Sequence, residues 1–259
     1  MPIEWSEATL TVAGTNIRVL QAGDGYPTVI LHHDIGTLDR LPFYNLLAAD
    51  TRVIIPTHPG WGLASERAEW MRSVRDIAAM YRMLLAQQAI PKANLVGLGF
   101  GGWIAAEMAT MAPADTGKVV LVGSMGVQPG EGYIMDMAVY GYLDYARAFF
   151  HDPAKFTEVY GEPTGDMLEG FDLCREMCFR VAWKPYMFSH TLPHLMQSLP
   201  NETLVVWGEH DKVVPISSCN RIVAALPNAR KEIVAGSGHA VDMEKPEELA
   251  GLVRNFLNA

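Results

Sequence analysis

The sequence predicts an α/β fold in which a mostly parallel sheet of about eight strands carries helices on both faces. Short β-branched apolar runs alternate with helical patterns along the chain, which is the order typical of such a sheet. The runs are almost continuously apolar, as expected for strands covered on both sides. A chain of 259 residues is near the upper size for one hydrophobic core, so we expect one core domain with an insertion.

Each element can be assigned from its local pattern. The candidates for buried strands are Thr28–His33, Arg52–His58, Ala93–Gly99, Lys118–Ser124, Thr203–Gly208 and Arg230–Ala235. Ala8–Ala13 and Asn16–Gln21 alternate between apolar and polar residues, so they predict an antiparallel edge. Helices are predicted at Met71–Gln88, Phe100–Met111, Ser217–Ala225 and Pro246–Leu257. The last of these begins with proline and acidic residues, which a first helical turn prefers.

Residues 128–199 do not follow the alternation. This segment is rich in Met, Tyr and Phe and is predicted to form several short helices. We interpret it as a cap inserted into a core domain made of residues 1–127 and 200–259. Ligands of open α/β sheets bind at the carboxyl ends of the strands, where such a cap would shape a pocket. Methionine and aromatic side chains adapt to irregular apolar shapes, which favours a small, largely apolar ligand.

Composition and charge exclude several classes of partner. The net charge of −9 argues against nucleic acid, and no apolar run is long enough for a membrane span. The first residues lack the pattern of a secretory signal, so we expect a cytoplasmic protein that binds neither nucleic acid nor membrane. Cys174 and Cys178 are spaced for one helix face, where packing explains them, and no zinc spacing is present. We expect no metal and no cofactor, and the oligomeric state stays open.

Four short motifs stand at the ends of predicted strands. The first is Gly97-Leu98-Gly99-Phe100-Gly101, a glycine turn between a strand and a helix. The second places Asp211 after the strand Thr203–Gly208, and the third places His239 after the last strand. The fourth is His32-His33-Asp34 after the first buried strand. Each one alone has an ordinary structural explanation, and the glycine turn alone would also suit a nucleotide. All four in this order are difficult to obtain by chance.

Together these motifs resemble the α/β-hydrolase fold family, whose nucleophile elbow has the pattern G-x-S-x-G. The resemblance covers almost the whole chain outside the cap. It implies Asp211 as the acid, His239 as the catalytic histidine, and backbone N–H groups of Asp34 and Phe100 as the oxyanion hole. The nucleophile position falls on Gly99, which has no side chain. The family usually has His-Gly where this chain has His33-Asp34.

The missing nucleophile leaves three interpretations open. In the first, an enzyme acts on a small carbonyl compound without a covalent intermediate, with His239 as general base oriented by Asp211. In the second, the pocket only binds a ligand or a partner, as in the N-myc downstream-regulated proteins, which resemble this chain in lacking the serine. In the third, glycine replaces the serine of an ordinary esterase-like hydrolase. A serine reintroduced by Gly99→Ser should then give weak esterase activity.

The surroundings of this site are less determined by the sequence. Asp34 either caps the next segment and faces away, or lies in the site, protonated or paired with His33 or His58. His33, Trp183 and Met187 are candidates for the substrate pocket. A metal held by His33, Asp34 and His239 is permitted by the spacing, but we do not expect one.

Overall fold

The computed structural model describes residues 3–259 and contains one eight-stranded sheet in the order β1-β2-β4-β3-β5-β6-β7-β8. The strands are β1 (Trp5–Val12), β2 (Thr15–Ala22), β3 (Pro27–Leu31), β4 (Arg52–Pro56), β5 (Ala93–Leu98), β6 (Thr116–Val122), β7 (Thr203–Gly208) and β8 (Ala229–Val234). The pairs β1–β2 and β2–β4 are antiparallel and the others are parallel. The fold class and the antiparallel edge predicted from the sequence are therefore confirmed.

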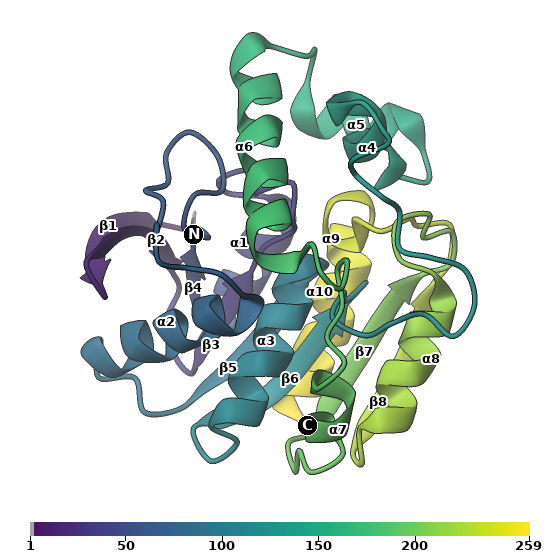
Figure 1. The fold of residues 1–259 in the computed structure, drawn as a ribbon. Coiled ribbons are helices and arrows are strands. Elements are labelled where there is room, and N and C mark those ends of the chain that lie inside the picture. Colours follow the sequence, from purple (N-terminus) through teal and green to yellow (C-terminus); the bar gives the residue numbers. More distant parts are fainter. Residues whose placement is uncertain (1–2) are drawn as a thin grey trace.

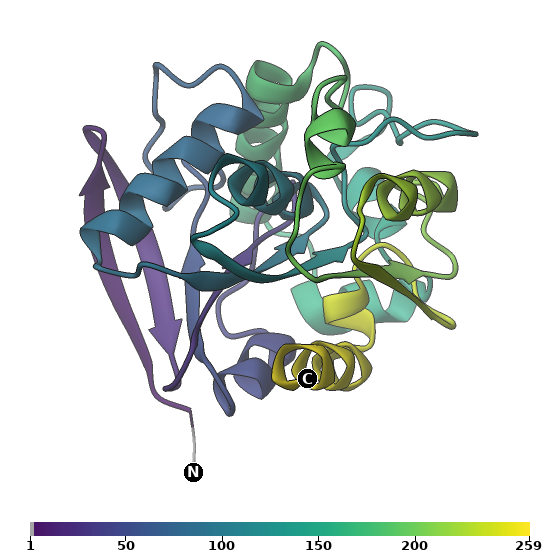
Figure 2. The same ribbon diagram turned by 90° about the horizontal axis from the view of Figure 1, so that it is seen from below.

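Helices cover both faces of the sheet (Figure 2). They are α1 (Pro42–Ala48), α2 (Val74–Gln87), α3 (Phe100–Met111), α4 (Tyr142–Ala148), α5 (Pro153–Tyr160), α6 (Gly165–Ala182), α7 (Leu192–Met196), α8 (Ile216–Ala225), α9 (Val241–Glu244) and α10 (Pro246–Asn258). Figure 2 shows α2, α3 and α8 on one face, and α1 packed beside α10 on the other. The central strands β5 and β7 are buried along their whole length because they lie between these two layers.

Several boundaries differ from the sequence-based assignment. The predicted strand Thr28–His33 ends at Leu31, because His32 and His33 leave the sheet in a turn closed by the hydrogen bond from Gly36 N–H to His33 O. The predicted helix Met71–Gln88 begins only at Val74, because the Ser73 hydroxyl accepts from Asp76 N–H as an N-cap. The short helices α1 and α9 were not predicted.

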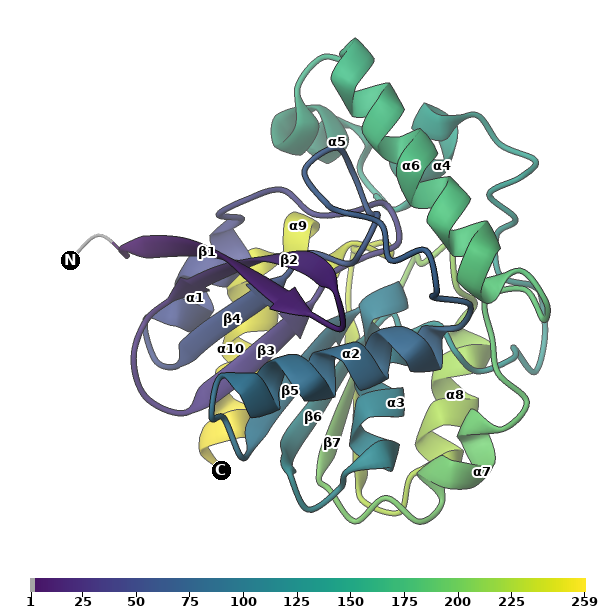
Figure 3. The same ribbon diagram turned by 60° about the vertical axis from the view of Figure 1, so that its left-hand side comes forward.

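The segment between β6 and β7 contains α4 to α7, and α4, α5 and α6 stand over one end of the sheet (Figures 1 and 3). That end carries the carboxyl ends of the parallel strands. The base of the segment is joined by a short bridge, since Gly126 N–H donates to Met187 O and Ser189 N–H donates to Gly126 O. Cys174 and Cys178 lie on α6, where both are buried.

Candidate functional site

Gly99 lies in the turn between β5 and α3, with φ +53° and ψ −113°. The positive φ favours glycine. A Cβ atom placed on Gly99 would lie 2.6 Å from Nδ1 of His33 and 2.8 Å from Nε2 of His239. Both separations are far below van der Waals contact, so two imidazole rings already occupy the space that any side chain at this position would need.

His239 lies on the loop after β8 and is hydrogen-bonded to Asp211 on the loop after β7. The distance from His239 Nδ1 to Asp211 Oδ2 is 2.8 Å, and both side chains are buried. The other oxygen of Asp211 accepts from the N–H groups of Val213 and Val214. Because Nδ1 of His239 donates to a carboxylate, its Nε2 carries the lone pair, and that nitrogen faces Gly99. The hydrogen bond expected from the sequence is present.

His33 makes an equivalent contact with a carboxylate that the sequence analysis did not single out. Its Nε2 lies 2.8 Å from Asp242 Oδ1, and both residues are buried. Nδ1 of His33 therefore carries the lone pair and also faces Gly99. Asp242 belongs to α9, three residues after His239. The sequence signal that could have identified Asp242 is its position on the same turn as His239.

Asp34 lies in the site and does not face away from it, so the alternative of an outward-facing cap residue is wrong. Its side chain is buried, and its Oδ2 accepts from the hydroxyl of Tyr145 at 2.7 Å. It pairs with neither His33 nor His58, because Asp242 holds the His33 ring and Tyr81 faces His58. Burial raises the pKa of Asp34, against the opposing effects of His239 and the Tyr145 hydrogen bond.

The site encloses more acidic side chains than an ordinary buried region, and they raise the pKa of the histidine among them. Burial alone would lower the pKa of His239, but the carboxylate of Asp211, helped by Asp34 and Asp242, outweighs it and raises this pKa. Among residues 3–259, the ion pairs of Asp211 and Asp242 are with histidines only. The site thus combines buried carboxylates and imidazoles with no lysine or arginine paired to them.

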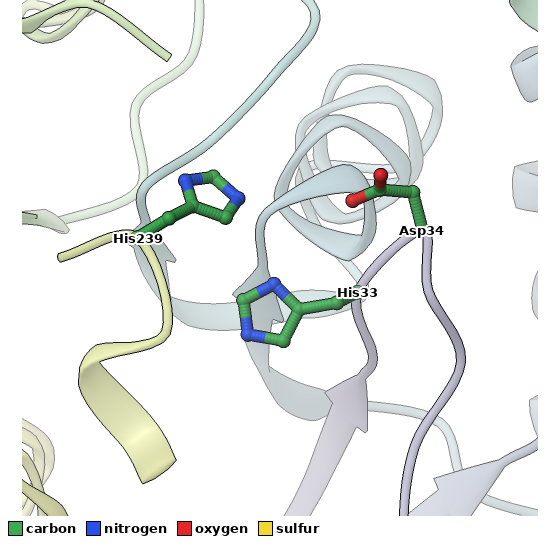
Figure 4. A group of neighbouring side chains, drawn as sticks. All are labelled: His33, Asp34 and His239. Carbon is green, nitrogen blue, oxygen red and sulfur yellow. The ribbon is translucent and has the colours of Figure 1, made fainter. Parts of the chain in front are cut away.

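Figure 4 shows that His33, Asp34 and His239 gather around one space, arriving from the loops after β3 and β8. Each of them can offer a ligand atom within 4.8 Å of those of the other two. Within the described residues, His33 Nδ1, Asp34 Oδ1 and His239 Nε2 are buried and have no hydrogen-bond partner. The spacing of these residues in the sequence permits such a cluster, but no metal was expected there.

The loop that carries His33 and Asp34 is held from beneath by other buried histidines. His58 N–H donates to the His32 ring, and the two rings stack with centroids 3.6 Å apart. The indole N–H of Trp61 donates to the backbone oxygen of Asp34. Burial lowers the pKa of His32 to about 3 and that of His58 well below its ordinary value, so both rings stay neutral and serve as structural elements.

The other candidate residues differ in how deeply they are buried. Phe100 is buried at the first turn of α3, directly after Gly99. Met187 is buried at the base of the inserted segment. Trp183 is 49% exposed and packs against Phe179 and Tyr186, so its place in a pocket stays a prediction.

A cavity of about 310 Å³ lies beside the Asp34 loop, between that loop and α6. Its lining is mainly apolar and includes Ile35, Gly36, Trp61, Phe171 and Cys174. This volume is at the lower end for small-molecule pockets, which span about 300–1,000 Å³. His33 and His239 do not line the cavity. None of the helices between residues 3 and 259 has the length and apolar character to cross a lipid bilayer.

Known proteins resemble this chain over most of its length. The family model described as "Alpha/beta hydrolase family" matches residues 29–252. The chain is 27% identical to the 2-hydroxy-6-oxononadienedioate/2-hydroxy-6-oxononatrienedioate hydrolase of Paraburkholderia phymatum, over 94% of this chain and 92% of that protein. It is 24% identical to the 2-hydroxymuconate semialdehyde hydrolase of Pseudomonas putida, over 96% of this chain and 92% of that protein.

Among solved structures, the meta-cleavage product hydrolase of Pseudomonas fluorescens IP01 superimposes with a TM-score of 0.80 at 23% identity, covering 97% of both chains. At that identity the likeness concerns the fold. The family model matches most of the chain, which indicates common ancestry in addition to a common fold. The chain belongs to the α/β hydrolase family.

Proposed function

We propose that this protein is an enzyme that acts on a small, largely apolar carbonyl compound without a covalent intermediate. His239, oriented by Asp211, is the general base that activates water or removes a substrate proton. The observation that carries this proposal is the buried hydrogen bond of 2.8 Å between the two residues, with the free nitrogen of His239 facing the Gly99 turn.

The covalent route is absent from this proposal because Gly99 stands in the nucleophile position. The space of a serine side chain is filled by the ring of His33, which Asp242 holds in place. His33 in this position is incompatible with a serine at residue 99, so a simple replacement of serine by glycine in an ordinary esterase is not favoured. The hydroxyl group of Ser124, two residues after β6, is buried and donates to the backbone oxygen of Met125.

The names of the relatives support the substrate class. They describe hydrolases of oxo-acids and of a semialdehyde, which are carbonyl compounds. The apolar cavity beside the Asp34 loop suits a small apolar body. In this proposal the segment 128–199 is a cap. Part of it must move to connect that cavity with His239, which is fully buried and packs against Phe149 of the segment.

The oxyanion hole of this proposal consists of backbone N–H groups of Phe100 and Asp34. The carboxylate of Asp34 lies in the site and opposes a developing oxyanion if it is ionised. Both water attack on the carbonyl group and removal of a proton from the carbon next to it develop negative charge on the carbonyl oxygen. In this proposal Asp34 is therefore protonated during the reaction, which its raised pKa favours.

A second candidate function is ligand binding without chemistry. The observation that favours it is the burial of His33 and His239, neither of which lines the apolar cavity beside the Asp34 loop. A binding protein would use the apolar cavity beside α6 and leave the histidines as structural residues.

One experiment separates the two functions. A library of small ketones, diketones and oxo-acids is screened by thermal shift, and each hit is incubated and analysed for products. For an enzyme, His239→Gln should lower turnover about 10²- to 10⁴-fold, the usual contribution of a general base, while the ligand still raises the melting temperature. His194→Gln, an exposed histidine on α7, is the matched control and should leave turnover unchanged. Recovery of every hit unchanged after long incubation would favour the binding protein.

A further inference from the structure

Three hydrogen-bonding atoms face one another beside Gly99, and within residues 3–259 none of them has a hydrogen-bond partner. Each imidazole gives its ring proton to a carboxylate, His33 to Asp242 and His239 to Asp211, so each inward nitrogen presents a lone pair. The third acceptor is Oδ1 of Asp34. Buried acceptors without a donor are unfavourable, and a cation is the simplest group that satisfies all three at once.

The donor set is that of a transition-metal site. Two imidazole nitrogens and one carboxylate oxygen hold Zn²⁺ in several hydrolases and Fe²⁺ in non-haem iron enzymes, and both leave further positions open. Ligand atoms about 2.1 Å from one ion lie about 3–3.5 Å from one another. The atoms offered by His33, Asp34 and His239 are within 4.8 Å of one another, so modest side-chain rotations bring them to one ion.

From these observations we propose that Nδ1 of His33, a carboxylate oxygen of Asp34 and Nε2 of His239 bind one divalent transition-metal ion. The remaining coordination positions face the space beside Gly99 (Figure 4).

A second shell supports each of the three ligands. Metal-binding histidines usually donate their other ring N–H to a carboxylate or carbonyl group, which fixes the tautomer and the ring orientation. Asp242 does this for His33 and Asp211 does it for His239, each at 2.8 Å. The hydroxyl of Tyr145 donates to the second oxygen of Asp34 at 2.7 Å. All these partners are buried, so their positions are well determined by packing.

The local charge also fits a dication. Asp34, Asp211 and Asp242 are buried within one cluster, and among residues 3–259 none of them is paired with lysine or arginine. Buried carboxylates need a compensating charge or a metal. Metal binding requires an ionised carboxylate and neutral imidazoles, and in that state a divalent ion offsets most of the negative charge of the three carboxylates.

Glycine at residue 99 is a requirement of this arrangement. A Cβ at that position would lie 2.6 Å from Nδ1 of His33 and 2.8 Å from Nε2 of His239, so it would contact both nitrogen ligands. Only glycine lets both nitrogens face the same point. A side chain at residue 99 and a second imidazole that faces the site therefore exclude each other.

This inference goes beyond the proposed function and does not depend on turnover. When the ion is bound, Nε2 of His239 is a ligand, and a water molecule on the ion becomes the base in its place, because a bound divalent ion lowers the pKa of water toward neutrality. The alternative occupant is a proton on His239, donated to Asp34, with no metal involved.

The test is direct metal binding to the full-length protein after treatment with a chelator. Zn²⁺ and Co²⁺ are titrated at neutral pH by calorimetry, and Co²⁺ is also followed by its visible absorption. We expect one equivalent bound with submicromolar affinity, a Co²⁺ spectrum typical of nitrogen and oxygen ligands, and no comparable binding of Mg²⁺. Fe²⁺ is titrated under anaerobic conditions to compare the two candidate ions.

Variants locate the ion. His33→Ala, Asp34→Ala and His239→Ala should each remove the tight binding, and Asp242→Asn should weaken it about 10- to 100-fold, as loss of a second-shell partner does. The control is the double variant His151→Ala/His210→Ala. These two exposed rings stack with centroids 3.9 Å apart and are the obvious adventitious site, so their removal should leave the tight binding intact.

Several outcomes would overturn the inference. These are no saturable binding of Zn²⁺, Co²⁺ or Fe²⁺ below micromolar concentration, or binding that the surface double variant removes and His33→Ala does not. If an alanine variant fails to fold, the wild-type Co²⁺ spectrum and Asp242→Asn decide the question. Turnover that needs His239 in a protein that shows no tight metal binding overturns this inference and keeps the proposed function. Tight metal binding at these three residues without any turnover does the reverse.

Discussion

The contact between Gly99 and the two imidazoles gives a quantitative prediction for Gly99→Ala. The new Cβ would lie 2.6 Å and 2.8 Å from ring nitrogens of His33 and His239, whereas comfortable contacts are about 3.5–4.0 Å. At least one ring must turn away and break its buried hydrogen bond to a carboxylate, which costs about 1–3 kcal/mol. The positive φ adds about 1–3 kcal/mol for a residue with a side chain.

The melting temperature provides the assay. At about 2–4 °C per kcal/mol for a chain of this size, Gly99→Ala should lower it by roughly 5–20 °C. Gly236→Ala is the matched control, because Gly236 has nearly the same φ, +58°, and a Cβ there meets nothing within 4 Å. This control isolates the backbone term.

A double-mutant cycle then isolates the clash. In a His33→Ala background, Gly99→Ala should be less costly by about 1–3 kcal/mol, because one of the two rings is gone. Equal losses of stability for Gly99→Ala and Gly236→Ala in the wild-type background would refute the reasoning, and would mean that the rings are not fixed beside Gly99.

Three further predictions concern reactivity, pH and the attachment of the inserted segment. Fluorophosphonate probes should not label the wild-type protein, and Gly99→Ser alone should be labelled poorly because His33 fills the serine position, whereas Gly99→Ser with His33→Gly should be labelled. Burial lowers the pKa of His58, so below about pH 6.5 the unfolded chain takes up a proton that the folded protein does not, and the free energy of unfolding should fall by up to about 1.4 kcal/mol per pH unit. Chemical denaturation between pH 7 and pH 5, compared between the wild-type protein and His58→Gln, separates this contribution from that of His32, whose pKa is also lowered. The carboxylate of Glu244 accepts N–H groups of Gly238 and of two residues before α5 at 2.6–2.9 Å, so Glu244→Ala should destabilise the protein by about 2–4 kcal/mol and increase proteolysis of the inserted segment.

Each of these predictions has its own counter-result. Stoichiometric labelling of the wild-type protein would reveal a nucleophile elsewhere, with Ser124 the first residue to test. If the free energy of unfolding of His58→Gln depends on pH as strongly as that of the wild-type protein, His58 does not cause the predicted loss of stability. Glu244→Gln keeps one acceptor oxygen and should therefore be more stable than Glu244→Ala. Equal stability of the two variants would mean that the hydrogen bonds accepted by Glu244 do not account for the destabilisation.

Much of the sheet was predictable because buried parallel strands have a strong signature. Thr203–Gly208 and the helix Phe100–Met111 match their predicted bounds, since apolar runs and a glycine turn mark them on both sides. Helix α9 was missed because four residues are too few for a periodic pattern. Some predicted strands extend beyond the observed strand end, as at His32, because the chain stays buried after it leaves the sheet.

The site was predictable only where sequence motifs mark it. Asp211 and His239 follow strand ends, and their hydrogen bond was expected. The partnership of His33 with Asp242 joins residues far apart in the chain and depends on how α9 turns back toward β3, which no local pattern encodes. The orientation of Asp34 likewise depends on Tyr145, a residue of the inserted segment whose packing could not be read from the sequence.

The bridge at Gly126, Met187 and Ser189 has a consequence for how this protein can change over evolution. Residues 127–188, which include α4, α5 and α6, leave and return at that bridge, so this part of the inserted segment is a loop whose ends are already closed. A segment of different length or sequence can replace it without shifting the register of β6 or β7. Such an exchange would keep the imidazoles and remove Tyr145, so selectivity and the environment of Asp34 can diverge together while the scaffold is inherited unchanged.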